Sequence, residues 1–312
     1  MAEAITFPSD GLTLSGAVHV PDDHRTGERR PAIIMMHGFG ANKNGGPEWI
    51  CRQFAAWGYV ALRFDFRGCG DSEGVRGRVI PTEEVADALH AVTYMAERPD
   101  VDPAAIALCG SSLGGGVAVQ AAGLDPRVAA VIVENGVAHG ERMIRSMHNA
   151  ESWNKFLALL EETARERTGA NKMIHRFDIF EMPKQLQVNL TSNDSLMQFT
   201  ADTALGFFMF RPEEFAAKVS PRPILILHSA RDRVTTYEEA FSLVRRAKPP
   251  VELHLLDGVT HFMFVNADPR VALTLRNWLD RYFPARRRRP SIASTFSKWR
   301  SRCKSTSPPT VR

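Results

Sequence analysis

The sequence predicts an α/β fold in which helices cover both faces of a mostly parallel β-sheet. Apolar runs of strand length recur along the chain, for example at residues 31–36 and 222–228. Segments of helical composition alternate with these runs, which favours parallel strands joined by crossover helices. With 312 residues and 44% hydrophobic content, the chain can bury the core of one full α/β domain.

The expected elements follow in a simple order. The chain opens with a hairpin in which residues 5–7 and 12–20 flank the turn Ser9-Asp10-Gly11. The later strands are expected at residues 31–36, 59–65, 104–109, 128–134, 222–228 and 251–256. The helices are expected near residues 47–57, 81–97, 113–123, 237–247 and 268–282.

The most informative motif is Gly110-Ser111-Ser112-Leu113-Gly114, which lies between an expected strand and a helix of small residues. Strand, G-x-S-x-G and helix together form the layout of a nucleophile elbow. A Cβ atom at either flanking glycine would collide with the neighbouring strand or helix. Ser112 is therefore expected in a strained conformation that projects its hydroxyl outward, while Ser111 points into the fold.

A serine hydroxyl becomes a useful nucleophile only beside a histidine that takes its proton and an acid that orients the histidine. Asp232 follows the strand at 222–228, and His261 follows the strand at 251–256. Both positions lie at carboxyl ends of strands, where sites gather in open α/β sheets. Ser112, His261 and Asp232 are thus predicted to form a triad. Glu134, at the end of another strand, remains an alternative acid.

An oxyanion formed at Ser112 needs two backbone N–H donors, one of which comes from the following residue, Leu113. The strand at 31–36 ends in the sequence His-Gly-Phe-Gly at residues 37–40. With this turn the chain resembles the α/β-hydrolase superfamily. The resemblance implies that the N–H of Phe39 is the second donor and that His37 braces the turn without transferring protons.

A second loop narrows the resemblance. Residues 65–72 read Asp-Phe-Arg-Gly-Cys-Gly-Asp-Ser, a D-x-R-G-x-G-x-S pattern. This pattern is similar to the serine-aminopeptidase-like, feruloyl-esterase-like and acyl-peptidase-like branch of the superfamily. The resemblance covers residues 3–284 apart from an insertion. It implies the fold and the acyl-transfer chemistry, but it does not specify the substrate.

About 90 residues separate Glu134 from Pro223, whereas a crossover needs a dozen or more. We therefore expect residues 136–210 to form a helical cap over Ser112, with the core in residues 1–135 and 211–284. The cap is rich in methionine and phenylalanine, which suits an apolar or aromatic acyl pocket. The residues concerned are Met143, Met147, Met173, Met182, Met197 and the run at 207–210.

The basic character of the chain belongs to its last residues. Residues 285–312 hold nine basic residues and no acid, so subtracting nine from the net charge of +4 leaves −5 for residues 1–284. This distribution argues against a nucleic-acid-binding domain, and the Ser-, Thr- and Pro-rich tail is predicted to be disordered. The tail also allows a basic amphipathic helix for an anionic membrane or a partner, built on one face from Ile292, Phe296, Trp299 and Cys303.

The sequence predicts no metal and no cofactor. The four cysteines have neither C-x-x-C spacing nor a nearby histidine pair, and the glycines at 114–116 are not followed by G-K-[ST]. The N-terminus lacks a secretory signal and no apolar run approaches a membrane span, so we expect a cytoplasmic protein.

Several other polar residues have structural interpretations. Two histidines within expected strands are interpreted as structural, namely His228 and His254. The histidines of the insertion are expected at solvated helix positions, with a pocket wall as the alternative, namely His139, His148 and His175. Two residues of the second loop are expected to tie that loop down, namely Arg67 and Asp71.

Together these observations predict a serine hydrolase for an ester or thioester with an apolar acyl or aryl group. Cleavage of peptides or amides, or of a carbon–carbon bond, remains open on the same triad. A serine at the elbow argues against haloalkane dehalogenases and epoxide hydrolases, which need a carboxylate there. From a different class, a ligand-binding module on a hydrolase fold is the competing hypothesis.

Overall fold

The computed structural model describes residues 2–166, 172–182, 187 and 194–285. An eight-stranded sheet forms the centre, in the order β1-β2-β4-β3-β5-β6-β9-β10. Within this sheet the antiparallel pairs lie at its N-terminal edge: β1 (Ala2–Ser9) pairs with β2 (Leu12–His19), and β2 pairs with β4. The six parallel strands are β3 (Arg30–Met36), β4 (Val60–Phe64), β5 (Val101–Ser111), β6 (Val128–Glu134), β9 (Ile224–Ser229) and β10 (Val251–Leu256). The predicted mostly parallel sheet is confirmed.

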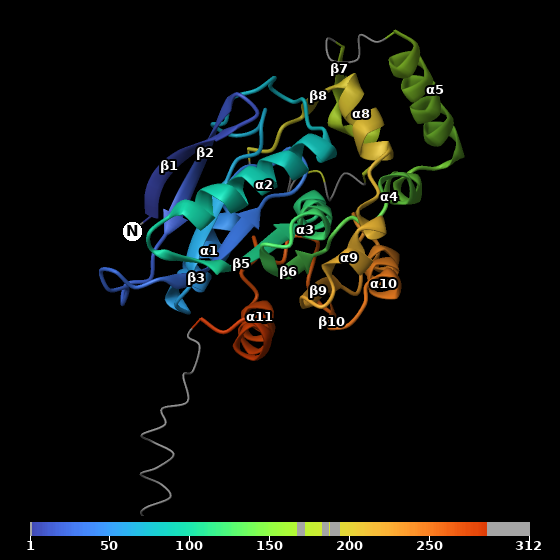
Figure 1. Ribbon diagram of the computed structural model, residues 1–312. Coiled ribbons are helices and arrows are strands. Elements are labelled where there is room, and N and C mark those ends of the chain that lie inside the picture. The colour runs from blue at the N-terminus through green and yellow to red at the C-terminus, as the bar shows by residue number, and fades with distance from the viewer. Residues whose placement is uncertain (1, 167–171, 183–186, 188–193, 286–312) are drawn as a thin grey trace, which may run out of the picture.

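Helices cover both faces of this sheet (Figure 1). One face carries α1 (Gly46–Ala56) and α11 (Pro269–Tyr282), whose Phe54 and Leu275 are buried in one core with Ile33 of β3. The other carries α2 (Pro81–Glu97), α3 (Leu113–Leu124) and α10 (Tyr237–Arg246). The central strands β4 and β9 are buried along their whole length, as expected for parallel strands covered on both faces.

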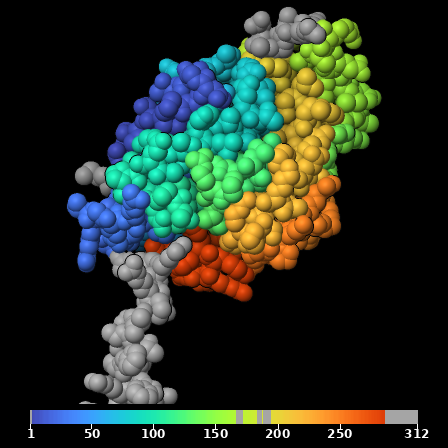
Figure 2. Space-filling model, in the orientation of Figure 1, coloured from blue at the N-terminus to red at the C-terminus, as the bar shows by residue number. Residues whose placement is uncertain are grey.

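The segment between β6 and β9, residues 135–223, is called the inserted segment below. Its longer helices are α4 (Gly140–Met147), α5 (Ala150–Glu166) and α8 (Ala201–Phe208). Its shorter elements are β7 (Met173–His175), α6 (Arg176–Ile179), β8 (Gln198–Thr200), the 3₁₀ turn Pro212–Glu214 and α9 (Ala216–Val219). In Figures 1 and 2 its yellow-green and yellow elements occupy one end and the adjoining side of the molecule. Whether residues 136–210 act as a cap stays a prediction.

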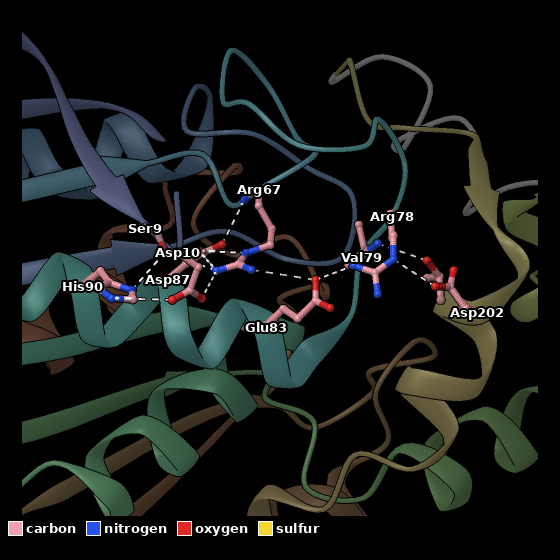
Figure 3. A network of polar contacts seen from close by, with 10 residues as sticks. Ser9, Asp10, Arg67, Arg78, Val79, Glu83, Asp87, His90 and Asp202 are labelled. Atoms are coloured by element: carbon pink, nitrogen blue, oxygen red, sulfur yellow. Dashed lines mark hydrogen bonds and ion pairs between the residues drawn. The ribbon is translucent and has the colours of Figure 1, made fainter. Parts of the chain in front are cut away.

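A chain of ion pairs joins the hairpin, the second loop, α2 and α8 (Figure 3). Arg67 contacts the buried carboxylate of Asp87 at 2.6 Å and the exposed carboxylate of Asp10 at 2.9 Å. Arg78 lies between Glu83 of α2 and Asp202 of α8, at 2.5 and 2.9 Å. Arg67 thus ties down its own loop as predicted, and Arg78 fastens the inserted segment to the core.

Asp71, the other residue predicted to tie down the second loop, contacts Lys43. Its carboxylate lies 2.5 Å from the Lys43 ammonium, which also contacts the buried Asp65 at 2.6 Å. The loop closes tightly around Asp65, because a Cβ at Gly70 would lie 2.1 Å from its carboxyl carbon. Such an approach is available only to glycine.

The structure corrects the interpretation of the inserted histidines. His148 is buried, and its Nε2 lies 2.8 Å from the carbonyl oxygen of Ile179. It follows the last turn of α4, where Trp153 and Phe156 of α5 cover it. His139 and His175 cap the starts of α4 and α6, so these rings accept amide hydrogen bonds instead of lying on solvated helix faces.

Two further sequence predictions concern the C-terminal tail and the absence of a membrane-spanning segment. The tail at 286–312, including the helical face at Ile292, lies outside the described residues. Among the described helices, none has the length and hydropathy required to cross a bilayer. The predicted cytoplasmic location stays a prediction.

Candidate active site

The elbow has the geometry that its glycines require. Ser112 connects β5 to α3 with φ 54° and ψ −116°, a region that side-chain-bearing residues rarely occupy. A Cβ at Gly110 would lie 2.0 Å from the Gly114 carbonyl oxygen, and one at Gly114 would lie 2.5 Å from that of His37. The steric prediction for both glycines is therefore confirmed.

Backbone bonds hold Ser112 in this conformation. Its amide donates to the carbonyl oxygen of Glu134 at 2.8 Å, and its own carbonyl accepts from Gly115 and Val137, each at 3.1 Å. The Ser111 hydroxyl donates to the Glu134 carboxylate, so it is already engaged with a neighbouring strand. Ser112 and His261 line one pocket, and Ser111 lies on the same pocket wall instead of pointing only into the fold as expected.

Asp232 and His261 come from neighbouring strands. Because β9 and β10 are paired in register up to Ser229 and Leu256, the loops that follow them leave the same edge of the sheet. There the His261 Nδ1 lies 2.7 Å from the Asp232 Oδ2, and both side chains are buried. The other carboxylate oxygen of Asp232 accepts from the amides of Val234 at 2.7 Å and Thr235 at 3.0 Å. These bonds fix the carboxylate against the imidazole.

The electrostatics of this pair suit a base that becomes charged during a reaction. Burial alone lowers the pKa of His261, but the Asp232 carboxylate, with a smaller contribution from Glu134, raises it above its usual value. Burial alone raises the pKa of Asp232, but the His261 charge and the hydrogen bonds it accepts hold the pKa below its usual range. The pair is therefore a carboxylate beside a histidine that protonates readily.

Glu134, the alternative acid, has different partners. Besides Ser111, its carboxylate accepts from the Asn135 side chain at 2.9 Å, and burial raises the pKa of Glu134 to about 7. No hydrogen bond within the described chain joins it to the His261 ring. It approaches the histidine indirectly, because the Asn135 amide also donates to the His261 carbonyl oxygen at 3.0 Å.

Asn135 is a site residue that the sequence analysis did not single out. Its side-chain oxygen accepts from the Ser229 amide at 2.7 Å, so one asparagine links the ends of β6 and β9 to the His261 loop. Its φ of 46° lies in the left-handed region that asparagine tolerates better than most residues. The sequence feature that indicates this position is the Asn135-Gly136 pair directly after a buried strand, because such a pair marks a turn.

The predicted oxyanion donors lie around the elbow. Leu113 is the first residue of α3, where helix amides have no intrahelical acceptor. Within the described part of the chain, neither its amide nor that of Phe39 donates a hydrogen bond. The turn that carries Phe39 passes close to the nucleophile position, because a Cβ at Gly38 would lie 3.2 Å from the Ser112 Cβ.

His37 is placed as a brace of this turn. Its Nε2 accepts from the Phe66 amide at 3.2 Å, which leaves Nδ1 to donate to the Gly38 carbonyl oxygen at 2.8 Å. Burial lowers the pKa of His37, so the ring stays neutral in this arrangement. The ring therefore connects the turn to the second loop.

The pocket has a volume of about 280 Å³. The inserted segment contributes an apolar wall of four side chains, namely Met143, Phe180, Met182 and Phe207. Met143, Met182 and Phe207 were among the residues expected to form the acyl pocket. Met173 and Met209 were also expected there, but their side chains are exposed. Among the residues that the structure describes, no group of His, Cys, Asp or Glu is arranged to hold a metal ion.

Comparison with known proteins agrees with this architecture. A polyketide transferase of Stachybotrys chlorohalonatus, ATR5, is 26% identical over 280 residues, 83% of this chain and 89% of its own length. The thiohydrolase aneE of Aspergillus aculeatus is 38% identical over 124 residues, 39% of this chain and 37% of its own. The crystal structure of the α/β hydrolase GrgF from Penicillium superposes with a TM-score of 0.77 at 24% identity, covering 90% of this chain and 99% of that one.

The family model described as serine aminopeptidase S33 matches residues 27–268, which include the elbow, Asp232 and His261. The resemblance inferred from the H-G-x-G turn and the second loop is therefore confirmed. The chain belongs to the serine aminopeptidase S33 family of α/β hydrolases.

Proposed function

We propose that this protein is a serine hydrolase that cleaves a carboxylic ester or thioester with an apolar acyl or aryl group. The observation that carries the proposal is the 2.7 Å contact between His261 and Asp232, together with the strained Ser112 that lines the same pocket as His261. A binding module would have no need for a serine held in an unfavourable backbone conformation next to a paired imidazole.

The chemistry follows from the placement of the atoms. Ser112 Oγ attacks the acyl carbon while His261 Nε2 takes its proton, and Asp232 stabilises the imidazolium and keeps the neutral ring protonated at Nδ1. The Phe39 and Leu113 amides donate to the oxyanion. His261 then protonates the leaving group, which gives an acyl-enzyme. Water, deprotonated by His261, attacks this acyl-enzyme and releases the acid.

The substrate class rests on the pocket wall. Methionine and phenylalanine side chains of the inserted segment face the same cavity as Ser112 and favour an apolar acyl or aryl group. We propose that residues 136–210 act as a cap that sets this preference. The thiohydrolase among the relatives supports a thioester as well as an ester substrate.

Acyl transfer is a second candidate, favoured by the polyketide transferase that matches most of the chain. The two reactions share the acyl-enzyme and differ in whether water or another nucleophile attacks it. Product analysis separates them: addition of a small alcohol or amine during turnover yields an acylated acceptor only in a transferase that binds that acceptor.

The test is turnover of p-nitrophenyl esters of graded acyl length, matching thioesters and peptide anilides. We expect esters or thioesters to be cleaved and Ser112→Ala to lower kcat by about 10⁴ while the circular dichroism stays unchanged. Ser111→Ala is the matched control, because its hydroxyl bonds Glu134 and should matter far less. Turnover retained in Ser112→Ala would contradict the proposal.

A further inference from the structure

Arg176 is a buried cation on the wall of the pocket. It is the first residue of α6 in the inserted segment and is 2% exposed. It lines the same cavity as Ser112 and His261. This position, among phenylalanine and methionine side chains, makes desolvation of the guanidinium charge costly.

Its hydrogen bonds go to neutral groups. Nε donates to the Leu196 carbonyl oxygen and Nη2 to that of Phe39, each at 2.9 Å. The guanidinium carbon lies 5.1 Å from the ring centre of Phe39 and 5.2 Å from that of Phe199, at cation–π distance. Nη1 makes no hydrogen bond with any described residue.

No carboxylate of the described chain forms an ion pair with Arg176, although Glu134 and Asp194 line the same pocket. The similarly buried Arg30 and the nearly buried Arg67 differ, because they contact Glu28 and Asp87 at 2.7 and 2.6 Å. Burial lowers the pKa of Arg176 to about 10, so the group remains charged near neutral pH. A buried charge without a counterion is costly, and an anion that enters the pocket would reduce that cost.

We propose that Arg176 binds an anionic oxygen group of the substrate through Nη1, so that the preferred ester or thioester carries a negative charge. This inference rests on the proposed function and names the substrate class of the same site. The charge can come from a carboxylate on the acyl group or from a phosphate on the leaving group. Since Nη2 holds the Phe39 carbonyl, the bound anion lies next to the oxyanion turn.

The experiment compares matched substrates in the wild type, Arg176→Gln and Arg222→Gln. The acyl arm uses p-nitrophenyl valerate and mono-p-nitrophenyl glutarate, which have equal chain length but differ in a terminal carboxylate. The leaving-group arm uses valeryl thioesters of N-acetylcysteamine and of coenzyme A. Arg222 is the control because it is partly buried and donates to the carbonyls of Asp125, Val128 and Ala122, away from the pocket residues.

The readout is the ratio of kcat/KM for the charged substrate to that for its neutral partner. We expect Arg176→Gln to lower this ratio by roughly 10- to 100-fold in one arm, which identifies the source of the charge. Arg176→Lys should keep part of the preference. Arg222→Gln should leave the ratio unchanged, even if it lowers the melting temperature.

A fall of equal size for charged and neutral substrates in both arms would overturn the inference, because it would show that Arg176 only holds the Phe39 turn. If no ester or thioester is cleaved by the wild type, the proposed function fails by itself. Calorimetric titration then decides the inference separately. Monomethyl glutarate or coenzyme A should bind the wild type at least 10-fold more tightly than Arg176→Gln, whereas dimethyl glutarate should bind both proteins equally. If each of the three ligands binds the wild type and Arg176→Gln with the same affinity, the inference is overturned.

Discussion

Replacing Asp232 by asparagine tests the orientation of His261 without changing the size of the side chain. In the wild type, one carboxylate oxygen accepts the Val234 and Thr235 amides, and the other lies 2.7 Å from the His261 Nδ1. In Asp232→Asn the amide oxygen keeps the two backbone donors, so the NH₂ group faces Nδ1. Nδ1 then has to accept, and the ring carries its proton on Nε2, the atom that should take the Ser112 proton.

The expected effect is large because the variant removes both the correct tautomer and the charge that stabilises the imidazolium. We expect kcat for the best p-nitrophenyl ester to fall by about 10⁴, equivalent to about 5.5 kcal/mol of activation free energy. The pKa of His261 should also fall, because the Asp232 carboxylate is what raises it against the effect of burial. The acid limb of the residual activity should therefore move to lower pH.

The assay is kcat/KM against pH for the wild type, Asp232→Asn and Asp257→Asn. Asp257→Asn is the matched control, because it removes the same charge from an exposed residue. Asp257 pairs with Arg231 at 3.0 Å. Asp257→Asn should leave the profile unchanged. Activity of Asp232→Asn within tenfold of the wild type would refute the reasoning, and a large loss in Glu134→Gln beside it would assign the acid to Glu134.

Three further predictions concern Glu134, the Arg67–Asp87 ion pair and the elbow. Glu134→Gln should move the acid limb of the pH profile to lower pH, but by less than Asp232→Asn does, because Glu134, with a pKa of about 7, carries only part of its charge where His261 titrates; an unchanged limb would contradict this. Arg67→Met should lower the free energy of unfolding in urea by about 3 kcal/mol, because it leaves the buried Asp87 without its cation. A loss below about 1 kcal/mol would show that the remaining partners suffice. Gly114→Ala should lower both stability and kcat, since the new methyl would lie 2.5 Å from a carbonyl oxygen of the oxyanion turn; wild-type kinetics would disprove that tight approach.

The sequence predicts the core well because its signals are local. The helix at Pro81–Glu97 matches its expected bounds, since it begins with proline, carries two acids in its first turn and lies between clear strand signals. The elbow is equally readable, because the close approach at Gly110 and Gly114 allows no side chain. Asp232 and His261 are found from the rule that sites lie at the carboxyl ends of parallel strands.

The pocket is less readable because its side chains come together through tertiary packing. Arg176 has no local motif, and its contacts with Phe39 and Leu196 depend on how the inserted segment folds over the turn. Met143 and Met173 look alike in sequence, yet one lines the pocket and the other is exposed. His148 is buried for the same reason, because the carbonyl oxygen that its ring contacts belongs to Ile179, 31 residues later in the chain.

The most direct test of the central claim is covalent labelling of the wild-type protein with a fluorophosphonate, followed by peptide mapping. An activated serine beside a base should attack the phosphorus centre and retain the label on Ser112. We predict stoichiometric labelling at Ser112, abolished in Ser112→Ala and strongly slowed in Asp232→Asn. A folded wild-type protein that remains unlabelled, or that carries the label on Ser111, would contradict the account.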